Sequence, residues 1–252
     1  MKKVLNIINF ADIPIHVFTA VILYAFFLLL GMVQGYLVNN PLVLFDVRIT
    51  NFFYIFRNET FLNIFYFITL FAESLVVIAL STILSIFFWF NKQHIYVFFL
   101  WLTLAVGEGI AIVSKYLFHI ERPALFLRAV VANSFSFPSG HATSVVLFYG
   151  FLVYLIFRNY ESLKIRAIAF LSFLSLVVLV DLSRLYLGVH YFSDVIAGNL
   201  VGFATLILLI EISEWFITKK LKKLPSRINL PQIYTFLFMV LVFVSISYCF
   251  QI

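Results

Sequence analysis

Three basic side chains stand at defined intervals around the apolar segments of this chain. Lys115 and Arg122 lie in the stretch KYLFHIERP, and Arg184 lies in a later stretch, SRLYLGVHYFSD. Each guanidinium group can direct two N–H donors at the oxygens of one phosphoryl group. Because like charges held close together repel each other, an anion between them would stabilise the arrangement. These residues therefore predict a phosphate-binding site.

A second anion-binding feature is expected at the segment PSGH, residues 138–141, where a new apolar run begins. The first N–H groups of a helix have no internal partners and lie at the positive end of its dipole. Gly140 allows close backbone approach to an oxyanion, and Pro138 suits the entry to a helix. The Ser139 hydroxyl adds a further donor. Ser139 and Gly140 are therefore candidate phosphate ligands.

His190 and Asp194 are four residues apart, so they share one face if a helix begins there. A carboxylate that accepts a hydrogen bond from one imidazole nitrogen leaves the other free to act as a nucleophile. His141, from a different helix, could then protonate the leaving oxygen. Each motif alone is commonly a helix cap, a surface pair or a turn. Together they supply the nucleophile, its orienting acid, the general acid and the charge clamp of phosphoryl transfer, with no metal or other cofactor.

The three segments resemble the signature of the type 2 phosphatidic acid phosphatase superfamily, which contains membrane lipid phosphatases and is related to vanadium haloperoxidases. The resemblance covers residues 115–194. It implies a six-helix core, phosphate binding by the basic residues with Ser139 and Gly140, and a phosphohistidine on His190. It also implies that His141 is the acid and that Asp194 orients His190. Many relatives carry a further arginine where this chain has Ile120, and the resemblance assigns no role to His119 or Glu121.

The elements that must position these residues are membrane helices. Hydrophobic residues make up 64% of the 252 residues, charged residues only 11%, and the mean hydropathy is +1.10, which is outside the soluble range. A helix needs about 20 apolar residues to cross a bilayer. Seven stretches qualify, near 17–37, 62–90, 95–118, 141–157, 167–187, 192–216 and 231–250. We therefore predict a single all-α integral membrane domain over 1–252, with a seventh, C-terminal span beyond the six-helix core.

The distribution of lysine and arginine predicts the orientation in the membrane. With a cytoplasmic N-terminus, eleven of the seventeen basic residues fall on the cytoplasmic side, and the motif residues fall on the outer face of a bacterial plasma membrane. The basic segment 219–227 is then an anchor at anionic lipid, which removes nucleic acid as a partner. Residues 1–18 are expected to be an uncleaved part of the chain, and 38–60 to lie in the outer interface. The single cysteine, Cys249, excludes an intrachain disulfide.

Five acidic residues fall within the predicted spans, where charge is costly and often functional. Glu108 could face Lys115 or serve as a buried packing partner, and Asp181 could hold the guanidinium of Arg184. No role is predicted for Glu73, and the last two acids are expected near the cytoplasmic interface. The five are Glu73, Glu108, Asp181, Glu211 and Glu214.

These features predict a phosphatase that acts on a lipid head group, with undecaprenyl diphosphate as the preferred substrate. Phosphatidylglycerophosphate, phosphatidic acid and lipid A phosphates remain open, since the catalytic residues contact only phosphate. A carrier that binds anionic lipids without cleavage would need the cations but not His190, Asp194 and His141. Use of the pocket with vanadate for haloperoxidase chemistry is the other alternative. The oligomeric state is left open.

Overall fold

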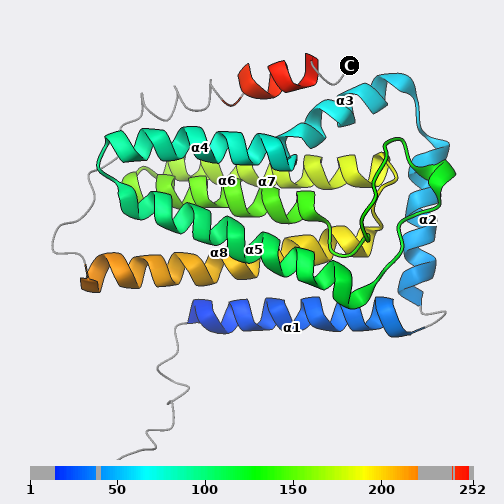
Figure 1. Ribbon diagram of the computed structural model, residues 1–252, viewed down its shortest axis with the longest axis horizontal. Coiled ribbons are helices and arrows are strands. Elements are labelled where there is room, and N and C mark those ends of the chain that lie inside the picture. The colour runs from blue at the N-terminus through cyan, green and yellow to red at the C-terminus, as the bar shows by residue number, and fades with distance from the viewer. Residues whose placement is uncertain (1–14, 38–40, 221–239, 241, 250–252) are drawn as a thin grey trace, which may run out of the picture.

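The computed structural model describes residues 15–37, 41–220, 240 and 242–249, and over these residues the chain forms helices and no strands. The prediction of an all-α membrane helix bundle is confirmed (Figure 1). The elements in chain order are α1 (Ile15–Tyr36), α2 (Pro41–Ile55), α3 (Glu59–Thr69), the 3-10 turn η2 (Leu70–Ala72), α4 (Ser74–Phe90), α5 (His94–Phe118), the 3-10 turn η3 (Leu125–Leu127), α6 (Gly140–Asn159), α7 (Leu163–Tyr186) and α8 (Phe192–Lys220).

Five of these helices, α1, α5, α6, α7 and α8, are each long and apolar enough to cross a membrane. A sixth crossing requires α3 and α4 together, and these two helices meet at an angle of 45°. The span predicted over 62–90 is therefore formed by two helices that meet at an angle. The helix breaks because Glu73 adopts an extended conformation, with φ −65° and ψ 135°, which ends the ladder of helical hydrogen bonds.

Helix α6 occupies the centre of the bundle, and half or more of it is enclosed by its neighbours. Small residues on α8 allow the two helices to approach closely, as is common between membrane helices. A Cβ atom at Gly198 would lie 2.4 Å from the Ser139 carbonyl oxygen, and one at Gly202 would lie 2.8 Å from Val146. This contact places the start of α6 directly against the first turns of α8.

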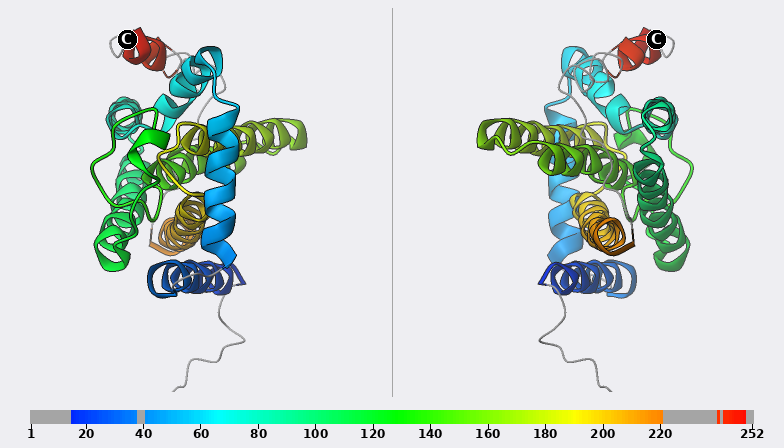
Figure 2. Two further views of the ribbon diagram at one scale, coloured as in Figure 1. Left: turned by 90° about the vertical axis from the view of Figure 1, so that its right-hand side faces the viewer. Right: turned by 90° about the vertical axis from the view of Figure 1, so that its left-hand side faces the viewer.

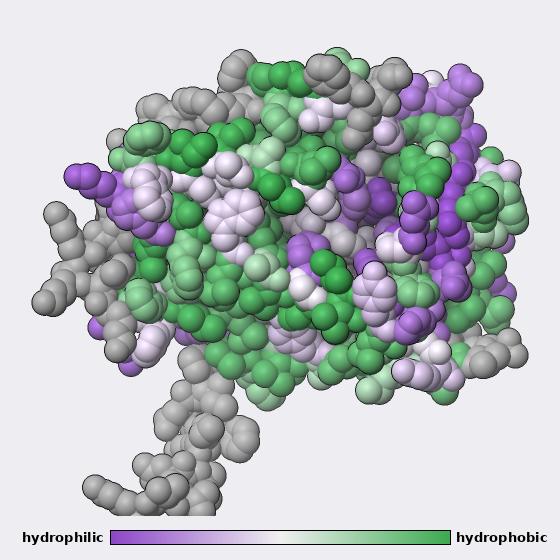
Figure 3. Space-filling view, viewed as in Figure 1, coloured by the Kyte–Doolittle hydropathy of each residue, from purple (hydrophilic) through white to green (hydrophobic). Residues whose placement is uncertain are grey.

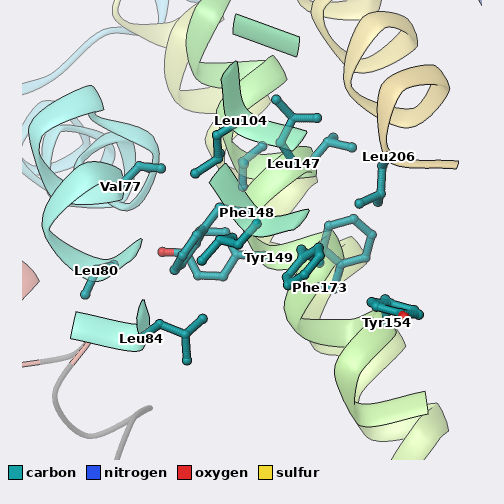
Figure 4. Packing of buried hydrophobic residues seen from close by; sticks show 14 of the residues in the cluster. Val77, Leu80, Leu84, Leu104, Leu147, Phe148, Tyr149, Tyr154, Phe173 and Leu206 are labelled. Atoms are coloured by element: carbon teal, nitrogen blue, oxygen red, sulfur yellow. The ribbon is translucent and has the colours of Figure 1, made fainter. Parts of the chain in front are cut away.

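The core between α4, α5, α6 and α7 is apolar and aromatic. Leu80, Leu147 and Phe148 are completely buried and pack together with Leu104 and Tyr149 (Figure 4). On the face shown in Figure 3, the surface is also apolar over most of the bundle, and polar residues gather mainly toward its two ends. A surface of this kind fits a bilayer, and the chain is a multi-pass membrane protein.

Helix α2 runs across one end of the bundle, almost perpendicular to the other helices (Figures 1 and 2). The long connection between α5 and α6 and the turn between α7 and α8 lie at this same end. The segment around α2 was expected outside the spans, and its direction agrees with that expectation. This end of the bundle carries all the predicted site residues.

The predicted seventh span, 231–250, lies mostly outside the described residues. Residues 242–249 are helical, and the ring of Tyr248 packs edge-on against Phe67 of α3 at 5.3 Å. The seventh span stays a prediction. Residues 1–14 and 221–227, on which part of the predicted orientation depends, also lie outside the described residues.

Candidate active site

His190 and Asp194 form a buried pair at the start of α8. Nδ1 of His190 lies 3.5 Å from Oδ2 of Asp194, and the side chains are 2% and 0% exposed. The same carboxylate oxygen accepts hydrogen bonds from the Ser136 hydroxyl and from the backbone N–H of Tyr191, the latter at 2.7 Å. Oδ2 of Asp194 thus has three contacts and faces one edge of the imidazole, whereas Oδ1 is buried without a partner among the described residues.

Arg122 contacts the opposite edge of the His190 ring. Its Nη1 lies 3.2 Å from His190 Nε2 and donates a second bond of 2.7 Å to the Val189 carbonyl. A guanidinium group can only donate, so Nε2 must be the accepting nitrogen and Nδ1 carries the proton. This is the tautomer that a nucleophile at Nε2 requires.

The surroundings of His190 keep the ring neutral. Burial lowers its pKa well below the usual value, and the positive charges of Arg122, Arg184 and Lys115 lower it further. Since the neutral imidazole is the nucleophilic form, the cations that would bind phosphate also maintain the reactive state of His190.

Lys115, at the end of α5, holds the connection that leads to α6. Its Nζ donates to the carbonyl oxygens of Phe135 at 3.0 Å, Ser136 at 3.4 Å and Pro138 at 2.7 Å. These bonds fold the segment 135–138 back over the end of α5, so that the Ser-Gly-His motif begins beside the basic residues.

Arg184 is almost completely buried at the end of α7. Its Nη1 donates to the Thr69 hydroxyl at 2.7 Å, while its Nε has no partner among the described residues. A buried guanidinium N–H without an acceptor is costly. A phosphate oxygen would supply the missing acceptor.

The start of α6 is capped by Ser139. Its hydroxyl oxygen accepts a long hydrogen bond of 3.5 Å from the Ala142 N–H, and its own N–H donates to the Asp194 carbonyl at 2.9 Å. The Ser139 side chain is fully buried and is not among the residues that line the pocket, whereas Gly140 and His141 are. A phosphate contact by Ser139 stays a prediction.

A carboxylate that the sequence left without a role contacts His141. Oε2 of Glu73, at the break between η2 and α4, lies 3.0 Å from His141 Nε2. The sequence-based prediction of the site did not include Glu73. The feature of the sequence that pointed to a functional role for Glu73 was its position inside an apolar span.

These side chains line one pocket of about 660 Å³ at the α2 end of the bundle. Its wall combines three cations, two imidazoles and one carboxylate from distant parts of the chain. The ionisable lining residues are Glu73, Lys115, Arg122, His141, Arg184 and His190. Asp194 lies behind His190 rather than in the wall. Among the residues predicted for the site, every charged or imidazole side chain is therefore placed in the pocket or in contact with a residue that lines it.

The family model of the PAP2 superfamily matches residues 96–218, a range that contains all the predicted motifs. The fold also matches the crystal structure of a transmembrane PAP2-type phosphatidylglycerolphosphate phosphatase from Bacillus subtilis, with a TM-score of 0.73 and 25% identity. That match covers 82% of this chain and 100% of the other. Residues 96–218 belong to the PAP2 superfamily. The predicted resemblance is confirmed.

Other PAP2 relatives match over shorter stretches. Phosphatidylglycerophosphatase B of Bacillus subtilis (strain 168) is 36% identical over 31% of this chain, and lipid phosphate phosphatase delta of Arabidopsis thaliana is 32% identical over 35% of it. The aligned stretches span 38% and 23% of the length of these two relatives. A crystal structure of LpxE from Aquifex aeolicus matches 68% of this chain and 95% of its own, with a TM-score of 0.50 and 25% identity. The relatives named as phosphatases are hydrolases of phosphoester bonds.

For two acids within the spans, the structure departs from one expectation and agrees with one of two alternatives. Asp181 does not hold Arg184: its Oδ2 accepts a 2.6 Å bond from Asn199 of α8, whereas Arg184 turns toward Thr69. The expectation is wrong because these residues, three apart on α7, face different neighbours. Glu108 accepts a 2.5 Å bond from Ser144 of α6, so it serves as a packing partner between α5 and α6.

Glu214 lies at the opposite end of the bundle from the pocket. It forms an ion pair with Arg158 and accepts a 2.7 Å hydrogen bond from the Tyr154 hydroxyl. This network joins α6 to α8 far from the site. Glu211, one turn earlier, is partly exposed.

The start of α8 is also fixed by α2. The carboxylate of Asp46, which is almost fully buried, accepts bonds from the Ser193 N–H at 3.0 Å and from the Ser193 hydroxyl at 2.6 Å. A carboxylate at a helix N-terminus satisfies free N–H groups there and interacts favourably with the dipole. The helix that lies across the bundle end thereby caps the helix that carries Asp194.

Proposed function

We propose that this PAP2 protein removes phosphate from a membrane lipid through a phosphohistidine on His190. The observation that carries the proposal is the polarised imidazole: Nδ1 faces the buried Asp194, and Nε2 faces Arg122 in a pocket lined by cations. A protein that only binds anionic lipids would need the cations but no such arrangement.

In the first step, Nε2 of His190 attacks phosphorus while Lys115, Arg122 and Arg184 bind the phosphoryl oxygens. The N–P bond forms as the bond between phosphorus and the leaving oxygen breaks. His141 donates its proton to that oxygen, so the lipid leaves as an alcohol, or as a monophosphate when the substrate is a diphosphate.

In the second step, water replaces the departed lipid. His141, now neutral, takes a proton from this water as its oxygen attacks phosphorus. The N–P bond breaks, inorganic phosphate is released, and His190 regains its lone pair at Nε2. Asp194 stabilises the positive charge that the ring carries while it is phosphorylated.

We propose a lipid head group as the substrate because the pocket opens at the end of an apolar bundle. The relatives favour a glycerophospholipid: one curated relative and one solved structure carry names of phosphatases for phosphatidylglycerophosphate. Undecaprenyl diphosphate, favoured by the motif's predicted side of the membrane, is the second candidate. Either would present a terminal phosphate to the same cations.

A phosphate-release panel in detergent and EDTA tests this proposal. The substrates are phosphatidylglycerophosphate, undecaprenyl diphosphate, phosphatidic acid and lipid A, and His190→Ala is the matched inactive control. We expect release from at least one lipid by the wild-type protein and none by the variant. Binding of these lipids without any release would support the carrier and overturn the proposed reaction.

We further propose that the pocket faces the outer side of a bacterial plasma membrane. A cysteine placed at Leu125, an exposed residue of η3 near the pocket, should react with a membrane-impermeant maleimide in intact cells. A cysteine at Glu161, between α6 and α7 at the other end, should react only after permeabilisation. Both variants would carry Cys249→Ser. The reverse pattern would invert the proposed orientation.

A further inference from the structure

We propose that the break in the second predicted span is a positioning device for the acid step, and that Glu73 is its positioning residue. This inference rests on the proposed function. It assigns a task to a residue that none of the three phosphatase motifs contains.

The break is a built feature of the fold. Helix α3 ends at Thr69, η2 follows over Leu70–Ala72, and α4 starts at Ser74. A break inside an apolar environment frees backbone carbonyls that need partners. Tyr149 of α6 supplies one, because its hydroxyl donates to the Phe71 carbonyl at 3.0 Å. The break is therefore clamped to the helix that carries His141.

Two side chains at the break hold two motif residues. Thr69 accepts a hydrogen bond from Arg184, and Glu73, four residues later, contacts His141 at 3.0 Å. Arg184 comes from α7 and His141 from α6. A straight helix over this segment would lack the extended residue that places the Glu73 carboxylate beside the imidazole.

An ordinary capping role does not account for Glu73. Although it occupies the N-cap position of α4, its side chain makes no capping hydrogen bond to that helix. The side chain is instead directed to His141 and lines the pocket.

The contact has a chemical consequence for His141. When the Glu73 carboxylate accepts the hydrogen bond from Nε2–H, the proton for the leaving oxygen is carried by Nδ1. The charged groups near His141 are Glu73 from the break, Arg184 from α7 and Arg122 from the α5–α6 connection, and the titratable ring of His190 comes from the α7–α8 turn. Glu73 is the acidic group in contact with His141, and its hydrogen bond fixes the orientation of the imidazole while favouring the protonated ring over the neutral one. We infer that this contact positions the proton that His141 donates.

Substrates that differ in their leaving group test this role. Decyl phosphate releases a poor leaving group that needs a proton, whereas para-nitrophenyl phosphate releases a good one that does not. We expect Glu73→Gln to lower kcat on decyl phosphate by about 100-fold and on para-nitrophenyl phosphate by less than about 5-fold, since general acid catalysis contributes roughly 100-fold or more. His141→Ala should show the same selectivity.

Matched variants separate positioning from loss of structure. Thr69→Val, at the same break, removes the contact to Arg184 and should lower activity on both substrates equally. Glu211→Gln, an acid-to-amide change on α8 outside the pocket, should leave activity on both substrates unchanged. Glu73→Asp keeps the charge and should recover part of the decyl phosphate activity.

An equal loss on both substrates with Glu73→Gln, or no loss on either, would overturn the inference while leaving the proposed function intact. Detergent gel filtration of each variant identifies a folding failure. If Glu73→Gln fails to fold, the inference is tested with Glu73→Asp, by the ratio of its kcat values on decyl phosphate and para-nitrophenyl phosphate. A wild-type protein that hydrolyses no phosphate ester would instead overturn the proposed function together with this inference.

Discussion

Arg122 donates to the imidazole nitrogen of His190 that faces the pocket, across 3.2 Å. In the empty pocket the lone pair that would attack phosphorus is therefore engaged by a cation. An incoming phosphate competes for that guanidinium with two or three negatively charged oxygens, and charge-assisted bonds to such an acceptor are stronger. We therefore expect substrate binding to release Nε2 of His190, the proposed nucleophile, as phosphorus comes into contact with it.

Replacing the nucleophile tests the centre of this arrangement. His190→Ala should lower phosphate release by at least about 1,000-fold, because the other imidazole of the pocket, His141, is engaged by Glu73. The variant should elute like the wild type from gel filtration in detergent. Normal turnover by the variant would show that the nucleophile is another residue.

The pH dependence of the reaction follows from the environment of His190. Its pKa is lowered, so the ring is neutral and reactive at pH values above that lowered pKa and loses reactivity only below it. The acid limb of kcat/KM that belongs to His190 is therefore expected below the usual histidine value of about 6.5.

Removing one nearby cation should move this limb. Arg122→Gln deletes a charge that lowers the pKa of His190, so the acid limb should shift to higher pH relative to the wild type on the same substrate. Comparing the two proteins cancels the ionisation of the substrate itself. A shift to lower pH would contradict the electrostatic account.

Metal removal should leave activity unchanged, since the charge of the phosphoryl group is neutralised by Lys115, Arg122 and Arg184. Phosphate release is measured before and after dialysis against excess EDTA. Complete loss of activity that magnesium restores would contradict the mechanism.

Vanadate is expected to inhibit. Its five-coordinate form resembles the phosphoryl group in the transition state, and such analogues bind more tightly than the substrate. Inhibition should be competitive. It should be weaker in Arg184→Ala, because Nε of Arg184 has no protein partner among the described residues and is available to bind the anion. Equal inhibition of the wild type and Arg184→Ala would show that vanadate does not bind at Arg184.

The contact between α6 and α8 can be tested with two glycines. A Cβ at Gly198 would lie 2.4 Å from the Ser139 carbonyl, a backbone atom, so Gly198→Ala should cost about 1–3 kcal/mol of stability and displace the start of α6. Gly109→Ala on α5, where a Cβ meets nothing within 4 Å, is the matched control. Gly198→Ala should show a lower unfolding temperature in detergent and slower phosphate release than Gly109→Ala.

Local sequence rules were sufficient for the residues of the three motifs. Ser139 and Gly140 begin α6, His190 and Asp194 come together where α8 starts, and apolar length predicted most of the spans. These inferences depend on neighbours within a turn or two, which a sequence displays directly.

The contacts missed by sequence reasoning are all made between distant segments. Thr69, Glu73 and Ser136 reach site residues that are 58 to 115 positions away along the chain. No proline or glycine in the sequence indicates the break at Glu73. The break depends instead on contacts with His141 and Tyr149 of α6. The spacing of Asp181 and Arg184 likewise suggested a contact between them. In the fold, each is instead bound by a residue of another helix, Asn199 for Asp181 and Thr69 for Arg184.

The three carbonyl oxygens around Lys115 occupy an ammonium group that we propose as a phosphate ligand. Phe135, Ser136 and Pro138 supply these oxygens. A phosphate would compete with them for Nζ, so we expect the strength of binding to be set by the difference between two sets of oxygen partners. Such a balance would favour release of inorganic phosphate after each turnover.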